Sequence, residues 1–352
     1  MLAILILLTL AILIITLVPP NTIINNKYTA NFMILFLFIY VAILLVIKEN
    51  LSIDMSRYVR DINIFSDLTL FQALNISPRE SMFIIFQWIV AQISTDPNVF
   101  YLAIWIIFGT VLLFSLKKIF EPWQLLILFF CYLNFFIFFG YITNTVRQGL
   151  AIALIISAAS KLLIKDSRSF VFYLSILAAP LIHITTLPLS LALFLIKKIN
   201  FNLKVVLSFW LIFAILYVTG LNQTLFGQLS SVISDIEFYT SEATIGRYDG
   251  RVNRLDFLLF SSFWIFYALI ALKKILNKDE NYKTLVKIYI IFNIYFLSLG
   301  FIGYSDRLAS YSWFFIPIIV LYPLFKSDKR RYVFIFLVVI IFVITSVVTG
   351  SL

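Results

Sequence analysis

Cysteine and histidine are almost absent from this sequence, which has one of each in 352 residues, Cys131 and His183. A single cysteine excludes an intramolecular disulfide and any metal site with several thiolate ligands. A single histidine excludes a multi-histidine site, and the sequence contains no DxD or HExxH motif. The stretch after the first apolar run, PPNTIINNKYTAN, has no acidic residue to hold a cation. We therefore expect chemistry that uses no metal ion and no other cofactor.

Charged residues are also scarce, at 12% of the chain, whereas 62% of the residues are hydrophobic and the mean hydropathy is +1.03. This composition excludes a soluble fold. Apolar runs of roughly 17–20 residues recur along the whole length, as helices that cross a bilayer require. The sequence predicts an all-α polytopic membrane protein with about 11–13 membrane segments, some of them broken or re-entrant. The expected spans are 2–18, 31–47, 81–94, 99–116, 123–140, 147–164, 169–196, 204–220, 256–272, 285–303, 309–325 and 332–350.

Three of these runs have unusual ends or lengths. The run 2–18 lacks a basic leading region and a small-residue cleavage site, so we expect a retained helix and not a signal peptide. The run 81–94 is short, and it suits either a full span or a partial, re-entrant helix. The run 169–196 is long and contains Pro180 and a second proline, which predicts two half-helices that meet near His183.

Lysines are concentrated in a few loops, which the positive-inside rule assigns to the cytoplasm. The net charge of +10 has this origin, and no pattern typical of nucleic-acid binding occurs. The expected cytoplasmic lysines are Lys117, Lys118, Lys161, Lys165, Lys197, Lys198, Lys204, Lys273, Lys274, Lys278, Lys283, Lys287, Lys326 and Lys329. The segments expected to face outward are 141–146, the turn near His183, 221–255 and 304–308.

The loop 48–80 carries charges of both signs, so the lysine rule does not decide its side. An apolar face recurs in it at helical spacing, formed by Tyr58, Ile62, Phe65, Leu68 and Phe71. A helix on the membrane surface and a plain structural helix both explain this pattern. The sequence has no internal repeat and no low-complexity linker, so we expect a single membrane domain over residues 1–352.

Arginines are distributed differently from lysines. Those in the expected outward segments or at helix mouths are Arg57, Arg60, Arg79, Arg147, Arg247, Arg251, Arg254 and Arg307. A guanidinium is planar, always charged, and binds phosphate through two parallel hydrogen bonds. A cluster of arginines on the outer side therefore suits a lipid-linked phosphate or pyrophosphate. The alternative for each arginine is an ion pair with a nearby acid such as Asp54, Asp249 or Asp306.

Arg147, in the stretch NTVRQGLAIA, is the strongest individual candidate. On a helix, Asn144, Arg147, Gln148 and Ala151 share one face at the helix mouth. An ionisable residue in such a place predicts a functional site. His183 lies in LAAPLIHITTLP on the same expected side. It is either a satisfied core or capping residue, or it orients or deprotonates an acceptor.

Two later segments add polar candidates. The arginines of the loop YTSEATIGRYDGRVNRLDF, 239–257, are Arg247, Arg251 and Arg254. The last two share a face if the chain is helical there, and the loop either closes over a substrate or is simply solvated. The segment GYSDRLASY, 303–311, places Asp306 and Arg307 at a helix start. Asp306 alternatively caps that helix or pairs with Arg307.

Several motifs follow one another in a defined order, namely SIDMSRY, PRESMF, ISTDPNVFYL, NTVRQGLAIA, FVFYLSILAAPLIHITTLPLSLAL and SDRLASY. In this order they resemble the EpsG/Wzy-type polysaccharide polymerases of bacterial exopolysaccharide and O-antigen assembly. The resemblance extends from Asp54 to about Leu195, with a weaker match at Arg307. Its sharpest marks are the Arg-Gln-x-x-Ala of Arg147–Ala151 and the histidine 36 residues after Arg147, at His183.

The resemblance implies a GT-C-like, multi-pass enzyme of the bacterial inner membrane that works at the periplasmic face. Such a polymerase transfers a glycan from undecaprenyl diphosphate to a new repeat unit on the same carrier, and the Asp54 loop would be periplasmic. The implied partners are lipid-linked glycans and the bilayer, with a Wzz-like chain-length regulator and a flippase as further candidates. The arginine-rich loop 239–257 departs from the family, so no roles are carried over to it.

Glycosyl transfer of this kind places negative charge on a diphosphate leaving group. Arginines would neutralise that charge in place of a metal. The candidates are Arg147 with Arg251, Arg254 or Arg307. Further candidates for substrate binding are Asn144, Gln148, Arg57, Arg247 and Glu80. The acceptor hydroxyl would be oriented or deprotonated by His183 or by a carboxylate, for which the candidates are Asp54, Glu80 and Asp306.

Three other functions would use similar residues. An O-antigen ligase takes the same donor and transfers the glycan to lipid A core. A lipid-linked oligosaccharide flippase needs a charged cavity that opens to both sides in turn and commonly has two related halves, and the sequence shows no repeat. A membrane O-acyltransferase of surface glycans would need a His/Asp or Arg pattern near a cytoplasmic acyl donor.

Overall fold

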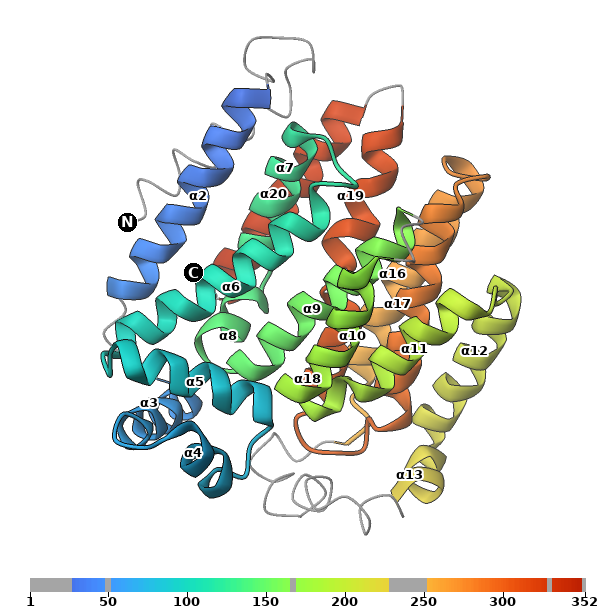
Figure 1. Ribbon diagram of the computed structural model, residues 1–352. Coiled ribbons are helices and arrows are strands. Elements are labelled where there is room, and N and C mark those ends of the chain that lie inside the picture. Colours follow the sequence, from blue (N-terminus) through green and yellow to red (C-terminus); the bar gives the residue numbers. More distant parts are fainter. Residues whose placement is uncertain (1–26, 48–51, 165–168, 228–251, 328–330, 350–352) are drawn as a thin grey trace. The chain divides into compact units, whose positions relative to one another are not determined.

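The computed structural model describes residues 27–47, 52–164, 169–227, 252–327 and 331–349, in which every regular element is a helix (Figure 1). Five described stretches are long and apolar enough to cross a bilayer: α2 (Lys27–Ile47), α6 (Pro97–Leu116), α9 (Val146–Leu163), α16 (Leu255–Lys274) and Ser305–Lys326. The prediction of an all-α polytopic membrane protein is therefore confirmed. The expected first span, 2–18, lies outside the described residues.

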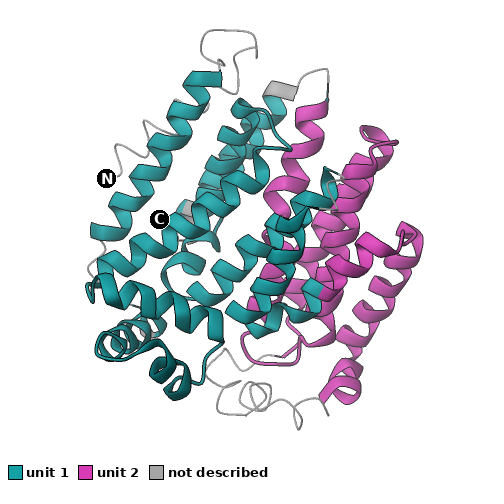
Figure 2. Cartoon of the chain, in the orientation of Figure 1, with its two compact units in different colours: residues 1–190, 327–352 teal, residues 191–326 magenta. Residues whose placement is uncertain are grey.

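The chain forms two compact units, one of residues 1–190 with 327–352 and one of residues 191–326 (Figure 2). The first unit contains α3 (Ile53–Phe65), α4 (Leu70–Ile76), α5 (Ser81–Ile93), α7 (Pro122–Leu133), α8 (Phe138–Thr143), α10 (Phe170–Ile182), η2 (Ile184–Thr186) and α20 (Arg331–Thr349). The second contains α12 (Leu203–Thr219), α13 (Leu221–Phe226), α17 (Glu280–Ser298), α18 (Ser305–Trp313) and α19 (Ile316–Lys326). The division falls within α11 (Leu187–Lys198). Such units are not by themselves separate domains, so the single membrane domain stays a prediction.

Two of the expected spans are interrupted. The run 169–196 divides at His183 into α10, η2 and α11, and the predicted break is confirmed. The run 123–140 was expected to be one span, and this is wrong because α7 ends at Leu133 and α8 begins at Phe138. Asn134 caps α7, and its backbone N–H and its Nδ2 both donate to the Phe130 carbonyl. A side chain that bonds its own backbone in this way competes with continued helix.

Helix α9 forms the interior of the first unit, where it packs against α6, α8 and α10. Its small residues allow neighbouring helices to approach closely, as in other membrane bundles. The closest approach is at Gly149, where an added Cβ would lie 2.1 Å from the carbonyl oxygen of Tyr141 on α8. Glycine is therefore required at this position. It allows α8 to lie beside the first turn of α9, which carries Arg147.

Helix α3 and the turn that follows it are fixed to α5 by side-chain hydrogen bonds to carbonyl groups. The pairs are Gln87 Nε2 with Tyr58 O (3.4 Å), Trp88 Nε1 with Leu68 O (2.8 Å) and Gln92 Nε2 with Phe65 O (3.2 Å). Tyr58, Ile62 and Phe65 are buried, whereas Phe71 on α4 is 72% exposed. Burial of the α3 face favours the plain structural helix over a helix that lies on the membrane surface.

Helix α5 is the short run for which two placements were open. It has 13 residues. At about 1.5 Å per residue it is about 20 Å long, less than the hydrocarbon thickness of about 30 Å. Its length favours the partial helix over a full span.

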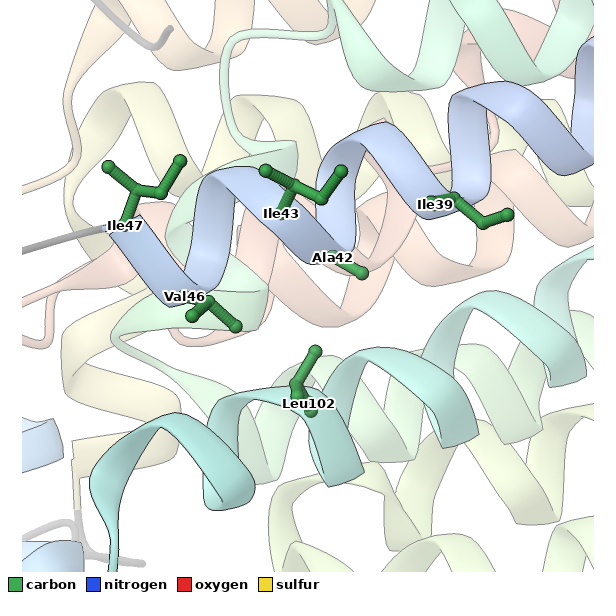
Figure 3. A pocket seen from close by; sticks show the side chains of 6 residues that line it. All are labelled: Ile39, Ala42, Ile43, Val46, Ile47 and Leu102. Carbon is green, nitrogen blue, oxygen red and sulfur yellow. The ribbon is translucent and has the colours of Figure 1, made fainter.

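An apolar groove of about 280 Å³ lies between α2 and α6 (Figure 3). Its lining consists of Ile39, Ala42, Ile43, Val46, Ile47 and Leu102. No side chain in this lining can bond a sugar hydroxyl or a phosphate. The groove is therefore not where polar substrate groups react.

Helix α17 is central to the second unit, where it packs against α12, α16, α18 and α19. Buried polar groups connect these helices. Trp210 Nε1 donates to Asn293 Oδ1 at 2.8 Å, and Trp313 Nε1 donates to Ser261 Oγ at 2.8 Å. Pairing of buried donors across helices is required where no water can replace the partner.

Candidate functional site

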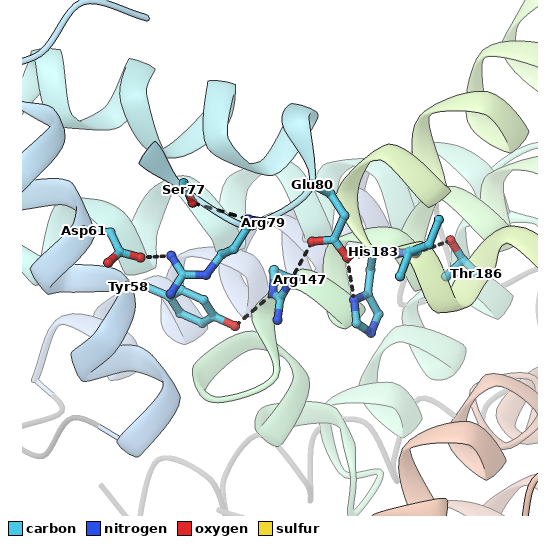
Figure 4. Close-up of polar contacts among 9 residues, drawn as sticks. Tyr58, Asp61, Ser77, Arg79, Glu80, Arg147, His183 and Thr186 are labelled. Atoms are coloured by element: carbon cyan, nitrogen blue, oxygen red, sulfur yellow. Dashed lines mark hydrogen bonds and ion pairs between the residues drawn. The ribbon is translucent and has the colours of Figure 1, made fainter. Parts of the chain in front are cut away.

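One carboxylate of the first unit connects two residues that are far apart in the sequence (Figure 4). Glu80 Oε2 accepts a hydrogen bond from Arg147 Nη1 at 2.7 Å, and Glu80 Oε1 lies 3.3 Å from His183 Nδ1. Oε1 also accepts the backbone N–H of Ile184 at 2.9 Å. The structure thus brings together Arg147, His183 and Glu80, three of the residues proposed from the sequence.

Each of these side chains is placed by the end of a helix. Glu80 is the N-cap residue of α5, and Arg147 is the second residue of α9. His183 caps the C-terminus of α10 with an extended backbone (φ −152°, ψ 109°). The break at His183 releases the N–H of Ile184 from helical bonding, and Glu80 accepts it. A broken membrane helix here supplies a backbone donor to a polar site, a use known from other membrane folds.

A second layer of contacts supports Arg147. Its Nε donates to the Tyr58 hydroxyl at 3.3 Å. The Arg79 guanidinium carbon lies 4.9 Å from the centre of the Tyr58 ring, and Arg79 is ion-paired with Asp61. Tyr58 and Asp61 were not predicted as site residues. Their spacing of three, which places both on one face of α3, was the available signal.

The cluster is half-buried and its central carboxylate is ionised. The side chains of Glu80, Arg147 and His183 keep 15%, 28% and 19% of their surface exposed. Burial alone raises the pKa of Glu80, but the His183 hydrogen bond and the Arg147 charge outweigh it and lower the pKa to about 2. A carboxylate with so low a pKa is a weak general base at neutral pH. Glu80 is therefore suited to orient its neighbours and not to take a proton itself.

Two candidates on α3 lie outside the Glu80 contacts just described. Asp54 Oδ1 lies 3.5 Å from Arg57 Nη1 in the first turn of the helix. The Arg57 side chain is 60% exposed. Exposed pairs of this kind contribute little to stability. Asp54 and Arg57 pair with each other within one turn of α3.

The expected polar face around Arg147 is only partly correct. Asn144 is the C-cap of α8 and precedes α9, so it does not share a helical face with Arg147. The chain turns there because the N–H groups of Asn144 and Thr145 both bond the carbonyl of Gly140. Gln148 is 3% exposed and Ala151 is fully buried, so both belong to the interior of the unit.

The remaining candidates belong to the second unit or to undescribed segments. Arg254 pairs with Asp256, with Nη2 2.6 Å from Oδ2. Arg254 has an extended backbone and precedes α16, so it is not helical and the condition for a face shared with Arg251 is not met. Arg307 lies 4.7 Å from the Tyr304 ring centre. Among the described residues, the buried Oδ1 of Asp306 has no hydrogen-bond partner. Two predicted arginines, Arg247 and Arg251, lie outside the described residues.

Ion pairing is frequent among the described arginines. The pairs are Arg57 with Asp54, Arg79 with Asp61, Arg147 with Glu80 and Arg254 with Asp256. The ion-pair alternative is thus realised at these positions, and only Asp54 was among the partners expected. The pair at Glu80 differs from the others because the same carboxylate also holds His183. Within the described ranges, no three His, Cys, Asp or Glu side chains are grouped so that they could hold a metal.

The helical membrane fold and the half-buried cluster at its helix ends define a multi-pass membrane protein with a polar site. The EpsG family model matches residues 31–351, nearly the whole chain. The chain therefore belongs to the EpsG family, a Wzy-type polysaccharide polymerase family, and the resemblance seen in the motifs is confirmed. No curated protein and no solved structure matches the chain. Family membership supports a role in polysaccharide polymerisation.

Proposed function

We propose that the chain joins oligosaccharide repeat units carried on undecaprenyl diphosphate, at the periplasmic face of the bacterial inner membrane. The observation that carries this proposal is the contact of Glu80 with both Arg147 and His183. The Glu80 carboxylate holds the guanidinium of Arg147, as the phosphate-binding group, and the imidazole of His183, as the proton acceptor. The transfer of a glycan from a diphosphate to a hydroxyl needs those two functions.

Arg147 is the group proposed to stabilise the leaving diphosphate. The bond from the donor's anomeric carbon to the diphosphate oxygen breaks, and negative charge develops on that oxygen. A guanidinium placed in advance neutralises such charge without reorganisation. The contacts to Tyr58 and Glu80 use Nε and Nη1, and neither of them uses Nη2. Because a guanidinium carries five N–H groups, the Nη2 side can donate to phosphate oxygens.

His183 is the group proposed to take the proton. The acceptor hydroxyl oxygen attacks the anomeric carbon, and its proton passes to His183 Nε2. A histidine that donates Nδ1–H to Glu80 carries its lone pair on Nε2, so this contact selects the useful tautomer. The Glu80 carboxylate also stabilises the imidazolium that forms. The lengthened glycan then remains on the acceptor's carrier, and the donor's carrier diphosphate leaves.

The proposed outward orientation of the cluster rests on two observations. Lysines fill the opposite loops, such as the one that contains Lys117 and Lys118. Helix α5 begins directly after Glu80 and is short enough to enter the membrane only partly. A partial helix at this point places the Asp54 loop on the outer side.

The length of surface polysaccharide tests this function in cells. In a strain without the native gene, His183→Gln and Glu80→Gln are expected to leave single capped units in place of long chains. Glu280→Gln serves as the control, since Glu280 is 57% exposed and pairs with Lys283 on α17. Long chains from both site variants at normal membrane abundance would overturn the proposal. A strain that lacks even single capped units would indicate a ligase.

A further inference from the structure

Tyr58 lies between two guanidinium groups (Figure 4). The Arg79 guanidinium carbon is 4.9 Å from the ring centre, and Arg147 Nε donates to the hydroxyl at 3.3 Å. Arg79 is in turn ion-paired with Asp61, which lies one turn after Tyr58 on α3. Tyr58 is only 5% exposed, so its use is to hold neighbours and not to touch a substrate.

The Tyr58 ring is fixed from several sides. The Phe83 ring of α5 meets it edge-on, with centroids 5.2 Å apart, and the Phe100 ring of α6 lies at 6.4 Å. Gln87 Nε2 donates to the Tyr58 backbone carbonyl at 3.4 Å. These contacts constrain the backbone and the ring of Tyr58, and with them the position of the hydroxyl. Supporting contacts of this kind are what hold a functional side chain in a productive geometry.

We propose that Tyr58 is a positioning residue for Arg147, and that Arg79 and Asp61 act through Tyr58. This inference rests on the proposed diphosphate role of Arg147. Tyr58 holds Nε and Glu80 holds Nη1, so the plane of the guanidinium is fixed and Nη2 is presented to the diphosphate. A long side chain that is ordered in advance loses less conformational entropy when it binds an anion. Arg79 contributes a cation–π contact to the ring that carries the hydroxyl.

Binding of inorganic pyrophosphate to the purified full-length protein, measured by titration calorimetry without divalent metal, tests the inference. Tyr58→Phe keeps the ring and its contact with Arg79 and removes only the hydroxyl. It is expected to weaken pyrophosphate binding roughly tenfold, as for one hydrogen bond to a charged group. Tyr101→Phe is the matched control, because the buried Tyr101 hydroxyl has no hydrogen-bond partner within the described part of the chain. Unchanged binding by Tyr58→Phe would contradict the positioning role.

Arg79→Lys, made alone and together with Tyr58→Phe, separates positioning from direct contact. Alone it is expected to weaken pyrophosphate binding, and in the Tyr58→Phe background it should cause no further loss, because both act along one path. Additive losses at unchanged melting temperature would mean that Arg79 touches the anion itself, which overturns the inference. Arg147→Lys distinguishes the two proposals. If it binds pyrophosphate normally, the diphosphate role of Arg147 fails. If it loses binding while Tyr58→Phe does not, only the positioning role fails.

Discussion

Glu80 determines how its two neighbours can act. It neutralises part of the Arg147 charge, and it faces the Nδ1 atom of His183. A carboxylate behind an imidazole fixes the tautomer and strengthens the ring as a base, an arrangement familiar from other active sites. In the proposed reaction the work divides between three side chains: Arg147 for the phosphate, His183 for the proton and Glu80 for their orientation.

The tautomer of His183 can be observed directly, because the chain contains a single histidine. In protein labelled with ¹⁵N-histidine, we expect the Nδ1–H tautomer to dominate the neutral ring. Glu80→Gln should reduce the proportion of that tautomer, since an amide holds the N–H less strongly than a carboxylate. Nitrogen chemical shifts at neutral to mildly alkaline pH measure the proportion. A ring protonated at Nε2 in the unaltered protein would exclude the proposed proton path.

The low pKa of Glu80 predicts a specific pH dependence of stability. Its pKa is about 2 in the folded chain against an ordinary value of 4.5. Because folding lowers the pKa of Glu80, its ionised form stabilises the fold at pH values above 4.5. This stabilisation is lost as the pH falls from 4.5 towards 2. The difference in melting temperature between the unaltered protein and Glu80→Gln should therefore be similar at pH values of about 7 and about 5. If the difference in melting temperature is already lost at a pH of about 5, burial dominates and the pKa of Glu80 is raised instead of lowered.

Part of the candidate site could be predicted from polar residues in apolar segments, and the rest depends on how the helices pack. Arg147 and His183 could be predicted because polar residues at breaks in membrane helices need a reason. Glu80 was one of three candidate carboxylates, and only the fold shows that it contacts both Arg147 and His183. Tyr58 appeared only as part of an apolar face, because its hydroxyl meets Arg147 only after α3 has packed against α5.

Close contact between α8 and α9 places Arg147, and it depends on one glycine. Gly149→Ala would push a Cβ to 2.1 Å from the Tyr141 carbonyl oxygen, so the backbones must separate. We expect the free energy of unfolding to fall by about 1–3 kcal/mol, as for other overpacked interiors. The measurement is the melting temperature of the purified protein.

A matched control lies in the neighbouring helix. A Cβ added at Gly140 on α8 would meet nothing within 4 Å, so Gly140→Ala should be neutral or slightly stabilising. Equal effects of the two alanines would show that close packing at Gly149 is not needed.

Helix breaks were predictable only where the sequence carries a recognised signal. The prolines of the run 169–196 marked the break at His183, since a proline removes a helical donor. The end of α7 at Leu133 has no proline, and it depends on Asn134 bonding the Phe130 carbonyl. An asparagine in an apolar run can also continue a helix, so the sequence favoured one unbroken span there.

We expect the lysine loops to lie in the cytoplasm and the Glu80 cluster to face outward. The single cysteine, Cys131, is fully buried and should give little background in labelling. Asn75→Cys on α4 is expected to react with an impermeant maleimide added outside sealed spheroplasts. Lys118→Cys should react only after permeabilisation. Both positions are exposed in the folded chain. The reverse pattern would place the Glu80 cluster in the cytoplasm.

The role of the Arg147 fork is tested most directly with the purified chain in liposomes, supplied with lipid-linked repeat units and a metal chelator. The unaltered protein should build long glycans, whereas Arg147→Lys should slow elongation by at least about a hundredfold, as the loss of a key charge-stabilising donor does. Lysine keeps the charge and loses the planar fork, so the comparison isolates geometry. Elongation by Arg147→Lys at the unaltered rate would contradict the account.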